Sequence, residues 1–529
     1  MKVLVCDAIS SDGLKNLKAI PNLEIDVQTD LPKAQLLQII PNYEIVIVRS
    51  STLIDRDVIE AGSRLALVAR AGMGVDTIDV PAATEKGVIV MNTPAANSVS
   101  AAEHSFALIL AMVRNVPQAH QDLKQGVWNR KKYTGTELAH KTLGLLGLGN
   151  VGRYVGQFAK AFQMKVIAFD PFITDQAAQQ LGVERVELDE LYKRSDILSI
   201  HAVLNEKTKH MVSKDAVSKM KKGIRICNCA RAEILDTQAM VQGLESGVIA
   251  GLALDVFETE PVPSDHPLVK HPQVVVTPHL GASTKEAQDQ VMESLVDQLR
   301  RYVEEDFILN GINVPAISHE KLQTLGPFLQ LAHEMGNIMG QLFDETASSI
   351  HIGIKSKNVE EKDLLPISHS ALAGFLKQQV SGRVNIVNAP LLAQERNIQW
   401  GRLSFEVESN YRHVIELHIT FAGGEQHILK GTIGTQNTPR IVQFDAFELE
   451  VRAKGCMLWL KNEDLPGIVG KWGSILGQKN INISQVQVSS VPKDRVALAV
   501  MNIDSPAGEE VLQALRGIEN VFEVKQVHL

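Results

Sequence analysis

The fold is decided by the stretch KTLGLLGLGNVG, residues 141–152. A short apolar run ends there in Gly147-x-Gly149-x-x-Gly152, and a helical pattern follows. This strand–turn–helix order is the context in which G-x-G-x-x-G binds a dinucleotide. The first glycine permits a tight turn, the second lets the backbone approach a pyrophosphate, and the third lets helix and strand pack closely. Free N–H groups at the helix start would then face the phosphates.

An acidic residue stands where the ribose of such a nucleotide would lie. The next apolar run, 166–169, ends in Asp170, about 20 residues past the glycines, where an acid binds the ribose hydroxyls. A carboxylate there would repel the 2′-phosphate of NADP. The sequence therefore predicts NAD as the cofactor.

Bulk composition limits the possible partners. A chain of 529 residues predicts three or four domains, and 45% hydrophobic and 22% charged residues are ordinary for a soluble protein. The net charge of −8 gives no reason to expect nucleic acid. The longest apolar run, 106–113, is too short to span a membrane, and the first residues read as a strand, not a signal peptide. The cysteines match no zinc or redox spacing, so we expect a cytoplasmic protein without a metal; they are Cys6, Cys227, Cys229 and Cys456.

The first two segments predict two doubly wound parallel-sheet α/β domains. Residues 1–97 alternate short apolar runs with helical patterns, which indicates βαβ units. Residues 98–283 form a second such unit around the glycine motif, and a helical pattern from 284 returns toward the first unit. We expect 1–97 with 284–311 to bind substrate and 98–283 to bind NAD, with a ligand cleft between them. The strand candidates of the first unit are 3–6, 23–27, 45–48, 65–69 and 88–91.

Two further domains follow a break in the pattern. Residues 309–315 read as a linker, and 315–452 as an α+β domain that carries no motif for chemistry. Residues 453–529 read as β-α-β-β-α-β, the ferredoxin-like order. A helical stripe after the linker indicates a core or an oligomer contact; its residues are Leu322, Leu325, Leu329, Ala332, Met335 and Ile338.

Arginines follow two strands of the first unit. Arg49 and Arg70 stand at strand ends, with Gly72 and Gly74 beside the second. Ligands in open α/β sheets lie outside the carboxyl ends of the strands. Either arginine alone could be solvated surface charge, but the two together predict a pocket wall.

The second unit offers a proton carrier and an anion anchor at strand ends. His279 follows the run 274–276, and histidine is the usual proton carrier near neutral pH. A carboxylate could fix its tautomer, and both Glu258 and Glu260 stand in the preceding strand-end loop. Arg231 could hold a substrate carboxylate through two parallel hydrogen bonds.

Several blocks resemble the signatures of NAD-dependent D-2-hydroxyacid dehydrogenases. They are NCAR at 228–231, LDVFETEP at 254–261 and TPHLGAST at 277–284, together with 70–79 and 92–98. The resemblance implies that His279 is the general acid/base, Glu260 its partner in preference to Glu258, and Arg231 the substrate anchor.

The same resemblance implies the ligand contacts. It is closest to long-form members that oxidise 3-phosphoglycerate on the phosphorylated route to L-serine. The backbone of Gly72 and Gly74 would contact the substrate carboxylate, while Arg49, Arg70 and Asn97 would line the pocket, with Arg49 best placed for a phosphate. The implied cofactor contacts are Met73, Gly147, Gly149, Asn150, Val151, Gly152, Asp170, Cys229, Ala230, Arg231, Asp255, His279 and Gly281.

The C-terminal part of the chain resembles the same long form. Residues 315–452 resemble its intervening domain, and the blocks at 462–470 and 481–483 resemble an ACT domain. Such domains bind amino acids, often at a subunit interface. The resemblance implies L-serine as a possible effector and a homo-oligomer, dimer or tetramer. The implied effector ligands are Asn462, Asp464 and Asn482.

Two departures from the family pattern keep other readings open. Ala232-Glu233 replaces a glycine pair after the anchor arginine, and Ala202-Val203 replaces threonine-proline. The alternatives are a reductase for glyoxylate, hydroxypyruvate or another 2-oxo acid, and a nucleotide-sensing interaction protein that has kept the fold. The basic run 130–132 could reach a neighbour's phosphate site, although a solvated loop is the favoured interpretation.

Overall fold

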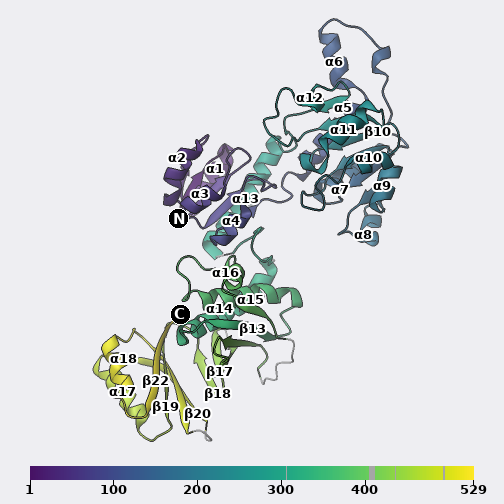
Figure 1. Cartoon of the computed structure of the whole chain (residues 1–529). Coiled ribbons are helices and arrows are strands. Elements are labelled where there is room, and N and C mark those ends of the chain that lie inside the picture. The colour runs from purple at the N-terminus through teal and green to yellow at the C-terminus, as the bar shows by residue number, and fades with distance from the viewer. Residues whose placement is uncertain (306, 318, 404–410, 435–436, 492–494) are drawn as a thin grey trace.

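Four β-sheets follow one another along the chain, each with its own helices (Figure 1). This computed structural model describes all residues except 306, 318, 404–410, 435–436 and 492–494. Within the described part, no helix has both the length and the apolar character needed to cross a membrane.

The first sheet is parallel, with the strand order β2-β1-β3-β4-β5. Its central strand β3 (Ile45–Val48) is buried on both faces, as expected for a sheet covered by helices on both sides. The order confirms the first doubly wound unit. The remaining elements are β1 (Lys2–Val5), α1 (Ser11–Lys18), β2 (Glu24–Val27), α2 (Lys33–Ile39), η1 (Ile40–Asn42), α3 (Arg56–Ala61), β4 (Leu67–Arg70), α4 (Val80–Glu85) and β5 (Ile89–Asn92).

The second sheet is parallel, with the order β12-β11-β10-β9-β6-β7-β8. The order reverses between β6 (Thr142–Leu146) and β9 (Ile197–Ile200), so a crevice forms where these neighbouring strands end. The chain continues from β6 into α7 (Asn150–Ala161), as the glycine motif predicts. The other elements are α5 (Ser98–Val113), α6 (Val116–Lys124), η2 (Lys131–Tyr133), β7 (Lys165–Phe169), α8 (Asp175–Gln180), β8 (Glu184–Arg185), α9 (Leu188–Arg194), α10 (Lys214–Lys219), β10 (Ile224–Asn228), η3 (Ala232–Ile234), α11 (Thr237–Glu245), β11 (Ile249–Leu254), α12 (Pro267–Lys270) and β12 (Val274–Val276).

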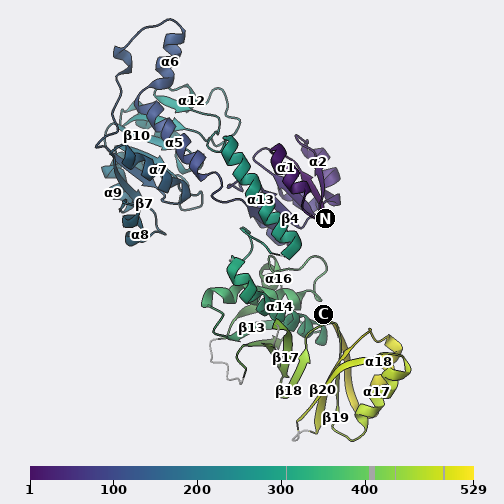
Figure 2. The ribbon, with the colours of Figure 1, turned by 180° about the vertical axis from the view of Figure 1, so that it is seen from behind.

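Helix α13 (Lys285–Glu305) joins the two parallel-sheet units, and both views show it running from the second unit to the first (Figures 1 and 2). Its apolar side chains complete the core of the first sheet, and a Cβ at Gly13 of α1 would lie 2.8 Å from Met292 Cβ. This close approach explains the glycine in α1.

The segment 309–315, expected as a linker, is docked on the edge strand β5. Ile312 N donates to Val90 O at 2.7 Å, and Val90 N donates to Asn313 Oδ1 at 2.9 Å. Backbone and side-chain hydrogen bonds therefore fix where the chain leaves the first unit, which a loop-like composition did not indicate.

The third sheet is mixed, with the order β14-β13-β15-β16-β17-β18. Helix α14 (His319–Leu342) covers it, and four of the six residues of the predicted apolar stripe lie in its core, with Leu329 packed against them and Leu322 outside that core. The other elements are β13 (Ala347–Lys355), η4 (Glu361–Asp363), α15 (Leu364–Leu376), α16 (Ala389–Glu395), β14 (Gln399–Arg402), β15 (Val414–Phe421), β16 (Gln426–Ile433), β17 (Pro439–Phe444) and β18 (Phe447–Arg452).

The fourth sheet is antiparallel, with the order β20-β21-β19-β22, and its elements confirm the ferredoxin-like prediction. They are β19 (Cys456–Glu463), α17 (Ile468–Gln478), β20 (Ile483–Val491), β21 (Val496–Ile503), α18 (Glu509–Arg516) and β22 (Val521–His528). The division of roles among 1–97 with 284–311, 98–283, 315–452 and 453–529 stays a prediction.

Candidate active site

The three glycines of the motif meet three different surroundings. Gly147 has φ +97°, and a Cβ there would lie 2.8 Å from the His201 carbonyl. A Cβ at Gly152 would lie 2.4 Å from Gly147 O. Gly149 instead has φ −73° and open space where its Cβ would be. Each glycine thus meets the surroundings that the motif predicts: a tight turn at Gly147, close packing at Gly152 and open backbone at Gly149. The open space at Gly149 fits a pyrophosphate lying against the backbone.

Asp170 follows β7 and holds the glycine turn. Its Oδ2 accepts from Leu148 N at 2.8 Å, and its Oδ1 accepts from Phe172 N at 2.9 Å. The carboxylate is therefore fixed beside the turn, where it could accept from ribose hydroxyls. This second, structural task was not visible in the sequence.

Asp255 holds the loop that carries His279 through hydrogen bonds to the loop backbone. Asp255 is buried, and its two oxygens accept from Leu280 N and Gly281 N at 2.8 Å each. Its Oδ1 also lies 3.0 Å from His104 Nε2 and accepts from the Thr277 hydroxyl at 2.6 Å. Burial acts to raise the pKa of Asp255, but the hydrogen bonds from His104, Thr277 and Leu280 outweigh it and lower the pKa.

His279 takes a backbone conformation that non-glycine residues rarely adopt, with φ +54°. The hydrogen bonds to Asp255 fix the loop in that conformation. They therefore also fix the direction in which the imidazole projects from the edge of the sheet. Nearly half of the side chain is exposed, at 46%. His201 differs, because burial lowers its pKa to about 4, so its ring is neutral near pH 7.

Glu260, and not Glu258, pairs with His279. His279 Nδ1 lies 2.7 Å from Glu260 Oε2, and Glu260 Oε1 accepts from Phe257 N at 3.1 Å. Glu258 is bonded instead to the hydroxyl of Thr237. The imidazole therefore has a carboxylate at Nδ1 and presents Nε2 for proton transfer.

Arg231 follows β10 in a loop shaped by a buried asparagine. Asn228 Oδ1 accepts from Ala230 N at 3.0 Å, and Asn228 Nδ2 donates to Arg231 O at 2.9 Å. The guanidinium donates to Asp76 Oδ2, in the first unit, from Nε at 2.9 Å. Arg231 thus reaches across the cleft to the loop that contains Gly72 and Gly74.

Three arginines lie close enough for their charges to interact, because those of Arg49 and Arg231 both act on Arg70. Arg70 Nε donates to Gly74 O at 2.8 Å, and Arg49 Nη1 donates to Ala8 O at 3.1 Å. Burial lowers the pKa of Arg70 to about 10; the charges of Arg49 and Arg231 act in the same direction, and those of Asp7 and Asp76 act against it. A cluster of cations that repel one another is a strong site for a polyanionic substrate.

The other predicted contacts lie in the same two loop systems. Met73 is exposed, and its carbonyl accepts from Asn92 Nδ2 at 2.6 Å. Asn97 precedes α5 as its N-cap residue without a side-chain capping bond. Cys229 Sγ lies 3.9 Å from Cys227 Sγ beneath the Arg231 loop. The assigned roles of these residues stay predictions.

The family departure at Ala232-Glu233 is accommodated without glycine. These residues begin the 3-10 helix η3, a conformation that any L-residue adopts. Ala232 is buried, and Glu233 O accepts from His210 N. At the other departure, Val203 is 61% exposed beyond the end of β9.

The three predicted effector ligands are not brought together within one chain. Asn462 is buried, while Asp464 and Asn482 are exposed. The strand register places Ile483 level with Cys456, at the opposite end of β19 from Glu463. At the usual rise per residue, Asp464 and Asn482 lie roughly 25 Å apart along the sheet.

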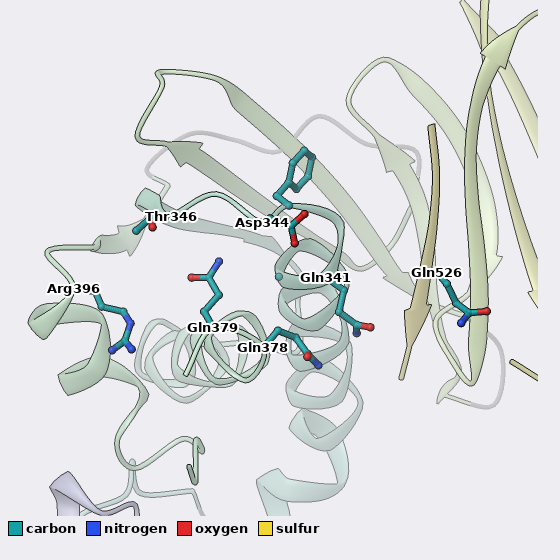
Figure 3. A pocket seen from close by; sticks show the side chains of 9 residues that line it. Gln341, Asp344, Thr346, Gln378, Gln379, Arg396 and Gln526 are labelled. Carbon is teal, nitrogen blue, oxygen red and sulfur yellow. The ribbon is translucent and has the colours of Figure 1, made fainter. Parts of the chain in front are cut away.

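A separate cavity of 570 Å³ lies beside helix α14, among the segments that follow α14, α15 and α16 and the strand β22 of the fourth sheet (Figure 3). No residue of the first two sheets lines it, so it is not the crevice at the strand ends. Four of its lining residues are glutamines; the lining is Gly340, Gln341, Phe343, Asp344, Thr346, Gln378, Gln379, Arg396 and Gln526.

Sequence reasoning did not single out Asp76, His104 or Asp7. Asp7 is buried at the end of β1, where it accepts from the Thr52 hydroxyl at 2.7 Å. Its position directly after a strand was the signal that could have identified it. His104 gave no signal, because nothing distinguishes it from the other fifteen histidines in the sequence.

Comparisons with known proteins match both parts of the chain and its full length. The family model "D-isomer specific 2-hydroxyacid dehydrogenase, NAD binding domain" matches residues 106–281, and the model "D-3-phosphoglycerate dehydrogenase intervening domain" matches 324–445. The chain is 38% identical over 530 residues to a D-3-phosphoglycerate dehydrogenase of Methanocaldococcus jannaschii, covering 100% of both chains. It is 36% identical over 528 residues to that of Bacillus subtilis, covering 100% of this chain and 99% of the relative.

Solved structures resemble the first two units. A formate dehydrogenase of Staphylococcus aureus in complex with NAD gives a TM-score of 0.54 at 29% identity, covering 59% of this chain and 98% of that one. A D-lactate dehydrogenase of Aquifex aeolicus with NAD and lactic acid gives 0.51 at 28% identity, covering 57% and 96%.

The surroundings of Gly149 and Gly152 predict different effects of an alanine substitution on stability and on NADH binding. Gly149→Ala should leave the melting temperature near wild type, because its Cβ meets open space, but should weaken NADH binding at least about tenfold. Gly152→Ala should cost more than about 2 kcal/mol of stability, because its Cβ meets a carbonyl. Thermal melts and NADH fluorescence titrations would measure both effects. Equal stability losses would contradict the assignment.

Asp255→Asn should destabilise the fold by about 2–4 kcal/mol at pH 7 and lower kcat, because an amide nitrogen would face a backbone N–H. The pKa of this carboxyl is lowered in the folded state, so its contribution is present above its unfolded pKa of about 4 and is lost as the pH falls through the folded value. Urea midpoints at pH 7 and pH 3 would test this. Asp215→Asn, at an exposed ion pair, should change neither quantity.

Proposed function

The chain belongs to the D-3-phosphoglycerate dehydrogenase family, and from this premise we propose that it oxidises D-3-phosphoglycerate to 3-phosphohydroxypyruvate with NAD⁺ as the first step of L-serine synthesis. One observation carries the proposal. An imidazole–carboxylate pair, His279 with Glu260, follows β12 on the sheet edge where Arg231 follows β10, and the charges of Arg231 and Arg49 both act on Arg70. That charge matches a substrate with a carboxylate and a phosphate better than it matches a small neutral-tailed acid.

The substrate would be held at both of its anionic ends. Arg231 and the loop amides of Gly72 and Gly74 bind the carboxylate, and the planar guanidinium suits that group. Arg49, at the end of β3, binds the phosphate. Arg70 lies between them with its Nε fixed on Gly74 O, so it contributes charge without moving.

His279 performs the proton transfer. A bound nicotinamide supplies the acceptor for the hydride that leaves C2 of the substrate. Nε2 of His279 takes the hydroxyl proton, because Nδ1 is engaged by Glu260 at 2.7 Å. Glu260 stabilises the imidazolium that forms and keeps the ring in one orientation. The fixed carboxylate of Asp170 favours NAD over NADP.

Self-association is supported by an apolar arm of the second unit. Helix α6 projects from that unit in both views (Figures 1 and 2), and Trp128, in the following loop, is 77% exposed. Val116, Leu123 and Val127 are also exposed there. Exposed apolar groups of this size mark interaction sites. We place a homo-oligomer contact on this arm, which also carries Lys132, paired with Asp122 at 2.7 Å.

An L-serine site would need two chains. Asp464 and Asn482 are exposed but lie at opposite ends of the fourth sheet. Side-by-side sheets from two copies could bring these ends together. The effector role of the fourth sheet, a dimer or tetramer and a cytoplasmic location all belong to this proposal.

A panel of D-2-hydroxy acids, followed by NADH absorbance with and without L-serine, tests the function. D-3-phosphoglycerate should give the highest kcat/KM, and His279→Gln should lower kcat by about 10²–10⁴-fold while NADH still binds. Preference for glycolate or D-glycerate would favour the reductase alternative. Turnover of no acid would favour a nucleotide-sensing protein.

Trp128→Glu should weaken self-association by about 30-fold or more, because a large exposed aromatic side chain is a typical interface anchor. Sedimentation or light scattering after gel filtration would show a smaller species. Phe172→Ser is the matched control, because Phe172 is 91% exposed but lies outside the arm. An unchanged mass for both variants would remove the arm from the interface.

A further inference from the structure

One ion pair crosses the cleft between the first two units. Arg231 Nη2 lies 2.8 Å from Asp76 Oδ2, and Nε donates to the same oxygen at 2.9 Å. Asp76 is in the loop after β4, and Arg231 is in the loop after β10. Among the described residues, no other ion pair joins residues 1–97 or 285–305 to residues 98–283.

The ion pair occupies the Nε and Nη2 side of the guanidinium and leaves the end formed by Nη1 and Nη2 for a ligand. Nε and Nη2 face Asp76, while Nη1 donates to Ala230 O at 2.7 Å. A guanidinium has five N–H donors, so one donor on Nη1 and one on Nη2 remain for a ligand. A carboxylate can accept these two end-on. Asp76 therefore does not occupy the place that the substrate carboxylate needs.

The backbone of the first unit is shaped to receive this arrangement. A Cβ at Gly74 would lie 2.0 Å from Arg231 Nη2 and 2.8 Å from Asp76 Oδ2. Any side chain at 74 would push the guanidinium away. Gly74 and Asp76, in one loop, thus both act on Nη2 of Arg231: Gly74 leaves space for it, and Asp76 attracts it.

Asp76 offsets part of the positive charge around Arg231. Burial lowers the pKa of Arg70 and the charges of Arg49 and Arg231 act in the same direction, while those of Asp7 and Asp76 act to raise it. Without a nearby carboxylate, like charges would turn the flexible side chain of Arg231 toward solvent. Asp76 supplies that carboxylate while remaining 58% exposed itself.

We propose that Asp76 is a positioning residue that orients Arg231 for end-on binding of the substrate carboxylate and joins this anchor to the opposite wall of the cleft. The inference deepens the proposed function and rests on it. It assigns a task to the Gly72–Asp76 loop beyond direct contact with the substrate, because the loop also aims a residue of the other unit.

The test is a comparison of KM and kcat in Asp76→Asn, which keeps the size of the side chain and removes its charge. KM for 3-phosphoglycerate should rise about tenfold, the effect of one charge-assisted hydrogen bond, while kcat changes by less than about threefold. KM for D-glycerate, which lacks the phosphate, should rise by the same factor. KM for NAD⁺ and the melting temperature should stay at their wild-type values.

Three variants control this experiment. Arg49→Gln should raise KM for the phosphorylated acid only. In an Arg231→Lys background, Asp76→Asn should have no further effect, because its action passes through the guanidinium. Asp57→Asn removes an exposed aspartate bonded to Lys33 in the same unit and should leave the kinetics unchanged. An unchanged or lower KM in Asp76→Asn would overturn the proposal.

A binding measurement separates this inference from the proposed function. Calorimetric titration of oxalate into the NADH-loaded enzyme measures how tightly the end of the guanidinium binds a carboxylate, without turnover. Weaker oxalate binding in Asp76→Asn, together with no oxidation of 3-phosphoglycerate by the wild type, would keep the positioning role and reject the substrate. Equal oxalate affinity in both proteins would reject the positioning role itself.

Discussion

The chemistry at the sheet edge depends on the buried carboxylate of Asp255. It accepts hydrogen bonds from two successive backbone amides, Leu280 N and Gly281 N, and these fix the turn in which His279 has a positive φ. A left-handed conformation at a non-glycine residue costs of order 1 kcal/mol or more and persists only where its surroundings hold it. Hydrogen bonds from His104 and Thr277 lower the pKa of the buried carboxylate, and the ionised carboxylate then holds the turn in place.

Most of the site could be predicted because it follows one rule of parallel sheets. Strands β7, β9, β10, β11 and β12 end one to three residues before Asp170, His201, Arg231, Asp255 and His279. Short apolar runs reveal such strands, and the residues after them must share an edge. The glycine spacing then identifies which part of that edge receives a nucleotide. No long-range information is needed for this step.

The remaining contacts depend on how separate units meet. The pairing of Asp76 with Arg231 joins residues 155 positions apart, and neither local periodicity nor turn chemistry encodes it. The docking of 309–315 on β5 could not be predicted for the same reason, since its partners lie more than 200 positions away. The distance between Asp464 and Asn482 is different, because the predicted β-α-β-β-α-β order already implies an antiparallel register that separates them.

The energy of the Asp76–Arg231 pair explains how one contact can aim a side chain without locking the cleft. An ion pair with both partners partly exposed contributes about 0–1 kcal/mol, discounted for solvent screening. A difference of 1 kcal/mol favours one arrangement only about fivefold. A substrate carboxylate that accepts from the two remaining donors of the guanidinium adds charge-assisted hydrogen bonds to the arginine that this pair orients. The pair therefore fixes the direction of the guanidinium more than it adds to the stability of the contact between the two units.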